Sequence, residues 1–148
     1  MISPIRFSEN VGIIIETREA EYLLFQRSRE NVLFLPILEY SNWRWKDDRK
    51  KLLIELSLTL FGITLQSKQL KQIWQGRKGI SLFRYKGEEF DRDTKISQSN
   101  MFAKVEWVLL SEVLQKKQSE FSPLTIIFLK KYQQLKPYEV RSDLIRRV

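Results

Sequence analysis

The apolar residues of this chain fall into short runs separated by polar stretches, a pattern that predicts several β-strands. Most runs are rich in β-branched or aromatic side chains. In residues 80–86 apolar and polar positions alternate, as expected of a half-exposed strand. A polar turn at residues 17–21 joins the first two runs into a predicted hairpin, and residues 39–50 and 87–100 are predicted loops. The predicted strands cover residues 11–16, 22–28, 32–35, 69–75, 80–86 and 102–110.

Three further segments have helical character. From about residue 47 to residue 61, apolar residues occupy nearly every face, which predicts a helix buried on more than one side. A short helix is predicted with Ser111 as its N-cap. The last helix is predicted to begin with Ser122 as N-cap and Pro123 at its first position, and to end at Pro137. Its expected apolar face consists of Leu124, Ile127, Phe128, Tyr132 and Leu135.

The order of these segments predicts one α+β domain over residues 1–148, with a mixed β-sheet sandwiched between helices. Hydrophobic residues make up 43% of the chain, which is enough to fill a core. The chain has no Cys and no His, so disulfides, thiolate zinc sites, thiol catalysis and serine–histidine triads are excluded. No apolar run approaches the length of a membrane span, and the N-terminus lacks a signal pattern. We therefore expect a protein of the cytoplasm or another intracellular compartment, with no membrane partner.

The charge balance points to an acidic partner. The formal net charge is +8, which favours a polyanion such as a nucleotide or nucleic acid, or an acidic protein surface. The densest basic cluster, in residues 40–51, also contains two tryptophans, and Trp and Arg can stack on bases while Lys and Arg contact phosphates. The alternative is that the tryptophans pack onto the core and the cations are solvated. The candidate binding residues are Trp43, Arg44, Trp45, Lys46, Arg49, Lys50 and Lys51, with Arg27, Arg84 and Lys104 on presumed strands.

The order of motifs resembles that of the Nudix hydrolases. The residues that carry the resemblance are Leu23-Leu24-Phe25-Gln26-Arg27-Ser28, Leu35-Pro36, Gly62-Ile63 at the end of the helix, and VEWVLLSEV at residues 105–113. The resemblance implies a Nudix-like fold. It also implies a metal-dependent diphosphate hydrolase, whose motif is Gly-x5-Glu-x7-Arg-Glu-u-x-Glu-Glu-x-Gly-u, with u aliphatic.

The acidic part of that motif is missing from this chain. The motif positions Arg-Glu and Glu-Glu hold Glu55, Leu56, Thr59 and Leu60, and the two early glycines are replaced by Ile37 and Leu38. Magnesium takes oxygen ligands, so a helix must present several carboxylates on one face to hold it. Glu55 is the only carboxylate between Leu52 and Ile63. We therefore expect a degenerate Nudix box without a cofactor: a pseudoenzyme that acts as a binding or regulatory module for a nucleotide, nucleic acid or protein.

Two alternatives remain open. In the first, Asp47, Asp48 and Glu55 form a displaced magnesium site and the chain is a Nudix-type pyrophosphohydrolase, although carboxylates at 47 and 48 also suit the start of a helix. The acidic loop at residues 88–93 holds four carboxylates that could add a ligand, or could simply be solvated. In the second, the chain is a structural interaction subunit of a larger protein or nucleoprotein assembly.

Overall fold

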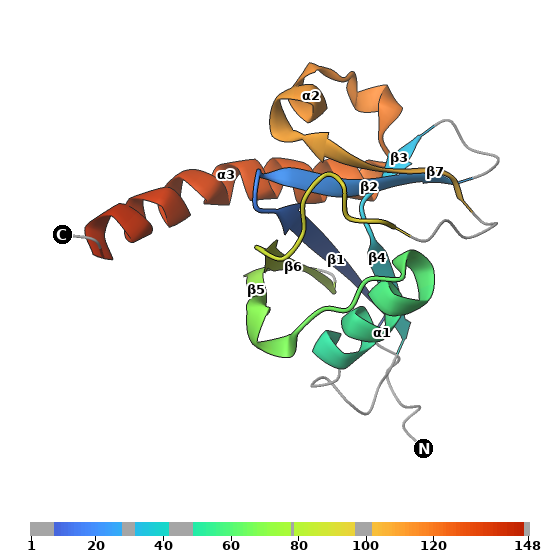
Figure 1. Cartoon of the computed structure of the whole chain (residues 1–148), viewed down its shortest axis with the longest axis horizontal. Helices are drawn as coiled ribbons and strands as arrows, with labels where there is room; N and C mark the ends of the chain where they lie inside the picture. Colours follow the sequence, from blue (N-terminus) through green and yellow to red (C-terminus); the bar gives the residue numbers. More distant parts are fainter. Residues whose placement is uncertain (1–7, 28–31, 42–48, 78, 97–101, 147–148) are drawn as a thin grey trace.

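A mixed β-sheet runs through the centre of the molecule (Figure 1). The computed structural model describes residues 8–27, 32–41, 49–77, 79–96 and 102–146. The strands are β1 (Ser8–Thr17), β2 (Glu21–Arg27), β3 (Leu33–Phe34), β4 (Ile37–Ser41), β5 (Leu70–Gln75), β6 (Ile80–Gly87) and β7 (Phe102–Leu109). The sheet is seven-stranded, with the order β3-β2-β1-β6-β5, while β4 also pairs with β1 and β7 with β2. The sheet is mixed because β1 and β6 are parallel and the other pairs are antiparallel.

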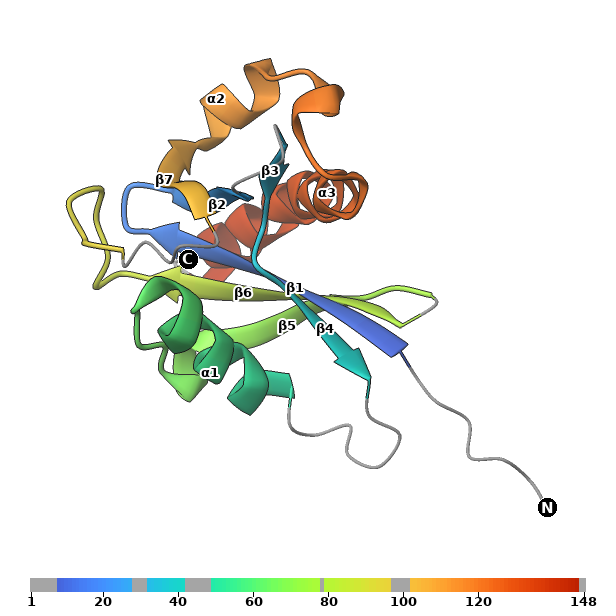
Figure 2. The same ribbon diagram turned by 90° about the vertical axis from the view of Figure 1, so that its right-hand side faces the viewer.

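Helices cover both faces of this sheet. Figure 2 shows α1 (Arg49–Phe61) on one side and α3 (Pro123–Arg146) on the other, while α2 (Leu110–Gln115) follows β7. Short 3-10 turns lie at Ser67–Gln69 and Gln118–Glu120. No helix in these ranges is long and apolar enough to cross a membrane. The predicted α+β architecture, a mixed sheet between helices, is confirmed.

The alternation of side chains along β1 creates two core clusters, one on each face of the sheet. Ile13 and Ile15 belong to a first cluster with Leu53 and Phe61 of α1, and Ile14 belongs to a second with α3. Gly12 lets α3 approach the second face closely. A Cβ atom at this position would lie 2.7 Å from the ring of Phe128.

The loop predicted at residues 39–50 is partly wrong. Residues 39–41 continue β4, in which Glu39 lies opposite Asn10 and Ser41 opposite Ser8 of β1. Pairing with β1 decides this conformation, and the local polar sequence carries no sign of it. The described part of α1 begins at Arg49, and residues 42–48 lie outside the described ranges.

Of the three helix ends predicted from a serine or a proline, one is confirmed and two are wrong. Ser122 caps α3 as predicted, because its Oγ accepts a hydrogen bond from the Thr125 N–H at 3.3 Å. The predicted cap at Ser111 is wrong, since α2 begins at Leu110 with Leu109 as its N-cap. The predicted end at Pro137 is also wrong, since α3 continues to Arg146. A proline removes one backbone donor from a helix, and here that loss does not end it.

The predicted buried face of α3 needs one correction. Phe128 and Tyr132 are buried as expected, but Ile127 is 46% exposed and Leu129 is buried in its place. The buried residues Thr125, Phe128, Leu129 and Tyr132 follow the spacing of a single helix face. Ile127 lies outside that face.

Candidate functional site

The helix that corresponds to the Nudix motif is α1, and it is fixed to the sheet along one stripe. Leu53, Ser57 and Phe61 are its buried residues and are spaced four apart. Its first residue, Arg49, donates hydrogen bonds to Gln75 Oε1 at 3.3 Å and Ser81 Oγ at 3.5 Å. At its other end, Gly62 has φ 68°, the left-handed conformation that glycine favours after a helix.

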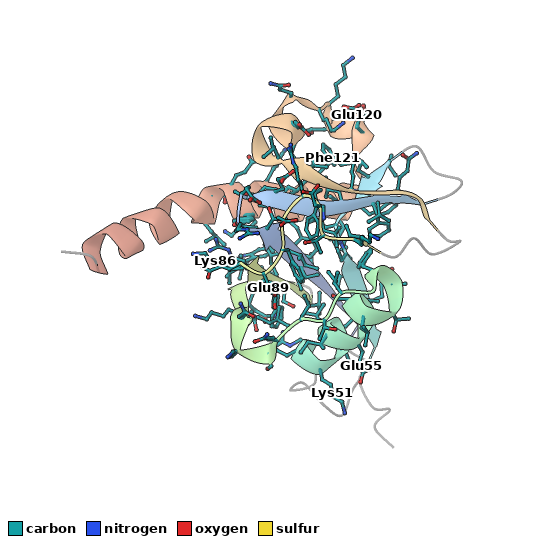
Figure 3. The ribbon with its side chains drawn as sticks, viewed as in Figure 1. Lys51, Glu55, Lys86, Glu89, Glu120 and Phe121 are labelled. Atoms are coloured by element: carbon teal, nitrogen blue, oxygen red, sulfur yellow. The ribbon has the colours of Figure 1, made fainter. Side chains whose placement is uncertain are left out.

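The residues at the motif positions Arg-Glu and Glu-Glu are exposed to solvent or carry apolar side chains. Glu55 is exposed, and Figure 3 shows it pointing away from the sheet together with Lys51. Thr59 is also exposed, while Leu56 is half-buried and Leu60 packs against the first core cluster. Only one carboxylate is therefore available on α1.

This arrangement does not fit a magnesium ion. A protein magnesium site combines oxygen ligands in a near-octahedral geometry, and carboxylates supply most of the protein's share. Within the described ranges, no group of three or more His, Cys, Asp or Glu side chains could hold a metal ion. Asp47 and Asp48, the other members of the displaced site, lie outside those ranges.

The two residues in place of the motif glycines belong to the extended strand β4. Ile37 lies opposite Gly12 and Leu38 opposite Val11 of β1. Ile37 packs against the second core cluster and Leu38 against the first. At the two positions where the Nudix motif has glycines, β4 therefore carries apolar side chains, one on each of its faces.

Only part of the basic cluster can be placed. Arg49 is half-buried and its guanidinium lies 5.9 Å from the centre of the Phe83 ring. Lys50 Nζ donates to the carbonyl oxygen of Ser67 at 3.4 Å, and Lys51 is exposed. Arg49 therefore fixes α1 to β5 and β6, and Lys51 is the cation most accessible to a ligand among these three. Trp43, Arg44, Trp45 and Lys46 lie outside the described ranges.

The candidate binding residues on the strands are Arg27, Lys104 and Arg84, and the structure shows side-chain contacts for Arg84. Arg27 is the last residue of β2, and Lys104 of β7 lies opposite Gln26. Arg84 forms an ion pair with Glu16, with 3.0 Å between Nε and Oε1, and its guanidinium lies 5.7 Å from the centre of the Tyr132 ring. The Arg84 side chain is only 19% exposed. Its contacts join β6, β1 and α3. Burial is the main reason that the pKa of nearby Tyr22 is raised, and the Glu16 carboxylate adds to the effect.

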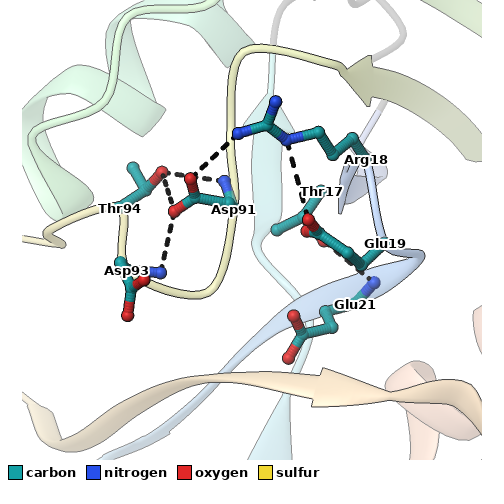
Figure 4. A network of polar contacts seen from close by, with 7 residues as sticks. All are labelled: Thr17, Arg18, Glu19, Glu21, Asp91, Asp93 and Thr94. Carbon is teal, nitrogen blue, oxygen red and sulfur yellow. Dashed lines mark hydrogen bonds and ion pairs between the residues drawn. The ribbon is translucent and has the colours of Figure 1, made fainter.

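The acidic loop is held by its own carboxylates (Figure 4). Asp91 accepts hydrogen bonds from the Asp93 N–H at 2.8 Å and from Arg18 at 3.0 Å. The Asp93 N–H, followed by Arg18, lowers the pKa of Asp91 below its ordinary value. Phe90 inserts into the first core cluster. Asp91 therefore stabilises the conformation of the loop, which is a structural role.

A neighbouring carboxylate in this loop is also engaged. Glu89 accepts a hydrogen bond from the Tyr85 hydroxyl, which in turn accepts one from the Gln66 N–H at 3.1 Å. Burial, together with the bond to Glu89, raises the pKa of Tyr85 to about 12. Glu89 therefore anchors the loop to β6.

In the part of the chain that the structure describes, two of the hollows were not indicated by the sequence. The larger, about 440 Å³, lies beside the acidic loop and is lined in part by Glu21, Arg92 and Trp107. Glu21 belongs to a segment that the sequence predicted to be a polar turn, yet its side chain is only 4% exposed and lies 3.4 Å from Arg92. The smaller hollow lies between α2 and α3. Distant parts of the chain form the larger hollow, whereas the smaller is lined by residues within 113–133 that only the packing of α2 and α3 brings together.

No protein-family model matches this sequence, and no curated protein matches it either. Solved structures do match. The MutT protein from Methanosarcina mazei aligns with a TM-score of 0.59 and 15% identity, over 87% of this chain and 94% of that one. A Nudix hydrolase from M. smegmatis, RenU, aligns with a TM-score of 0.55 and 12% identity, over 89% and 87%.

A third match comes from a complex. The C-terminal domain of mouse MUTYH, solved together with human PCNA, aligns with a TM-score of 0.58 and 13% identity, over 88% of this chain and 90% of that one. At such low identities these matches speak for the fold alone. The fold that they share with this chain, predicted above from its motifs, is the Nudix fold.

Proposed function

We propose that this chain is a catalytically silent Nudix-fold domain that acts as a binding module. The observation that carries the proposal is the composition of α1, whose single carboxylate, Glu55, is exposed. Cleavage of a diphosphate bond needs a divalent cation to offset charge and position the attacking water. The next positions on the Glu55 face of the helix, Leu58 and Thr59, offer no second carboxylate.

The test is a hydrolysis assay over several substrate classes. Nucleoside triphosphates, dinucleoside polyphosphates and nucleotide sugars are each incubated with the protein and Mg²⁺ or Mn²⁺, and the nucleotide products are separated and quantified by anion-exchange chromatography. We expect wild type and Glu55→Gln to give the same signal as buffer. Robust turnover by wild type would contradict the proposal. If Glu55→Gln abolished that turnover, the displaced site with Asp47 and Asp48 would be supported instead.

The ligand of this module is an acidic partner. The net charge of +8 favours either a polyanion or an acidic protein surface. One domain of the same fold, that of MUTYH, was solved in complex with the protein PCNA, so a protein partner is compatible with this fold. The basic cluster that includes Lys50 and Lys51 favours nucleic acid. The ratio of absorbance at 260 and 280 nm in the purified protein separates these cases, because copurifying nucleic acid raises it and would support a nucleoprotein subunit.

A further inference from the structure

An apolar groove lies between α2 and α3, on the side of the sheet opposite α1. Its apolar lining consists of Val113 of α2, Phe121, and Ile126 and Leu129 of α3. All four belong to or pack against the second core cluster, whereas α1 packs against the first. Figure 3 marks Phe121 in the segment between α2 and α3. The core side chains that form this lining give the groove a rigid floor.

Two lysines flank this floor. Lys116 follows the end of α2, and Lys130 lies on α3. Neither has an acidic partner among the residues that the structure describes. One turn before Lys130 on α3, Ile127 is 46% exposed, although it does not line the groove. The groove thus combines an apolar floor with two cations that have no ion-pair partner in the described ranges.

The size of the groove limits what it can hold. Its volume is about 210 Å³. Pockets for nucleotides and other small ligands usually measure about 300–1,000 Å³. The groove is therefore too small for such a ligand but suits one or two anchoring side chains of a peptide, the common arrangement when a helix or extended segment docks.

We infer that this groove is a docking site for a segment of a partner protein that places an apolar side chain on the floor and carboxylates beside Lys116 and Lys130. The charge pattern selects this occupant, since unpaired cations at an apolar rim are complementary to acidic residues that flank an apolar anchor. The inference goes beyond the proposed function. The groove is distant from the motif helix, so the inference stands whether or not the chain hydrolyses diphosphates.

The first experiment is a selection from a phage-displayed random peptide library on the immobilised 148-residue chain. We expect the enriched peptides to combine Leu, Ile or Phe with flanking Asp or Glu. The best peptide is then labelled with fluorescein and its Kd is measured by fluorescence anisotropy. Binding should shift the methyl NMR signals of Val113, Ile126 and Leu129, which lie in the groove.

Charge-reversal variants test the rim. Lys116→Glu with Lys130→Glu should weaken peptide binding about tenfold or more, because two attractive contacts become repulsive. The matched control reverses Lys71 and Lys86, two exposed lysines of β5 and β6, and changes the net charge equally. The control should bind as wild type does. A peptide whose acidic residues are changed to Lys should bind the protein that carries Lys116→Glu and Lys130→Glu. It should bind neither wild type nor the control variant.

Four results would overturn the inference. The first is a selection that enriches no peptides of acidic and apolar character. The second is an equal loss of affinity in both double variants, which would indicate general charge attraction. The third is that the methyl signals of the groove stay unchanged on peptide binding, because the peptide then binds elsewhere. The fourth concerns a small amphiphile. If decanoate, an alkyl carboxylate, shifts those methyl signals and no selected peptide does, the groove is a site for small amphiphiles and the partner segment is excluded.

Discussion

Glu16 and Arg84 form an ion pair inside the fold, and it shows how a single residue can be mistaken for a ligand-binding group. The sequence places Arg84 at a polar position of a half-exposed strand, which made it a candidate binding residue. In the structure its guanidinium lies 3.0 Å from Glu16 and over the ring of Tyr132. The partner comes from a strand 68 positions away in the chain, so no local pattern could reveal it.

Removal of Arg84 should therefore destabilise the fold. Arg84→Met keeps much of the side-chain volume but leaves the Glu16 carboxylate buried without its cation, and we expect a loss of about 2–4 kcal/mol in the free energy of unfolding. Adding Glu16→Gln should recover part of that loss, with a coupling of about 1–3 kcal/mol in a double-mutant cycle measured by urea unfolding. Arg18→Met is the control, because Arg18 pairs with Asp91 at the surface and should cost at most about 1 kcal/mol. Additive effects at positions 16 and 84 would refute the pairing.

Asp91 gives a prediction for acidic pH. Its pKa is lowered in the folded state, chiefly by the Asp93 N–H and then by Arg18, from an ordinary value of 3.8. A lowered folded pKa means that the stabilising contribution is present above 3.8 and is lost as the pH falls through the folded value. Wild type should thus be more stable than Asp91→Asn near neutral pH, and the two urea midpoints should converge below about pH 3.8. If the difference between the two urea midpoints stays constant on acidification, this stabilising role of Asp91 is excluded.

At the scale of elements, the start of α3 is fixed by a short chain of buried hydrogen bonds. The Ser122 hydroxyl donates to Thr125 Oγ1 at 2.7 Å, and the same Oγ1 accepts from the Leu35 N–H at 3.1 Å. The Thr125 N–H donates back to Ser122 Oγ. The cap of α3 is thereby joined to the segment between β3 and β4, so the helix start also positions Pro36 and β4.

Substitutions at this cap should cost more than an exposed cap would. Ser122→Ala removes the acceptor for the Thr125 N–H, and we expect a loss of about 1–2 kcal/mol in the free energy of unfolding. Thr125→Val leaves the buried Leu35 N–H without its acceptor and should cost about 1–3 kcal/mol. Ser119→Ala, at an exposed serine, is the control and should have little effect. If Thr125→Val unfolds at the wild-type urea midpoint, the link between α3 and Leu35 contributes nothing.

The sequence predicted those elements whose cause is local. Ser122 before Pro123 is a cap signal that needs no partner, and the aliphatic runs of β1 and β2 form strands in the positions expected. The sequence missed what depends on distant residues. Residues 39–41 form a strand because β1 lies beside them, and Ile127 is exposed because α3 turns Leu129 toward the core instead. At the site, the missing carboxylates of α1 were visible in the sequence, but the exposure of Glu55 and the structural contacts of Arg49 were not.

On the scale of the whole molecule, the fold separates two basic surfaces. The cations at the start of α1 lie on the face of the first core cluster, and the lysines of the groove between α2 and α3 lie on the face of the second. A net charge of +8 creates an attractive field for anions around the whole protein, but only local contacts decide where a partner binds. The two surfaces can therefore be tested separately.

Binding of nucleic acid at the first surface should depend strongly on salt. The logarithm of affinity should fall linearly with the logarithm of salt concentration, and each lost phosphate contact should reduce the slope by about 0.7–0.9. We would replace Arg44, Lys46 and Lys51 with Ala and leave Arg49 in place, because Arg49 holds α1 to Gln75 and Ser81 and its loss would also destabilise the helix. The triple variant should bind all sequences more weakly and flatten the slope, since phosphate contacts carry little base information.

A control with Ala at Lys71, Lys86 and Lys95, which are exposed elsewhere, should bind nearly as wild type does. If wild type fails to bind RNA and DNA at low salt, or if the triple variant and the control behave alike, the basic cluster is no nucleic-acid site, and an acidic protein partner becomes the better explanation of the charge.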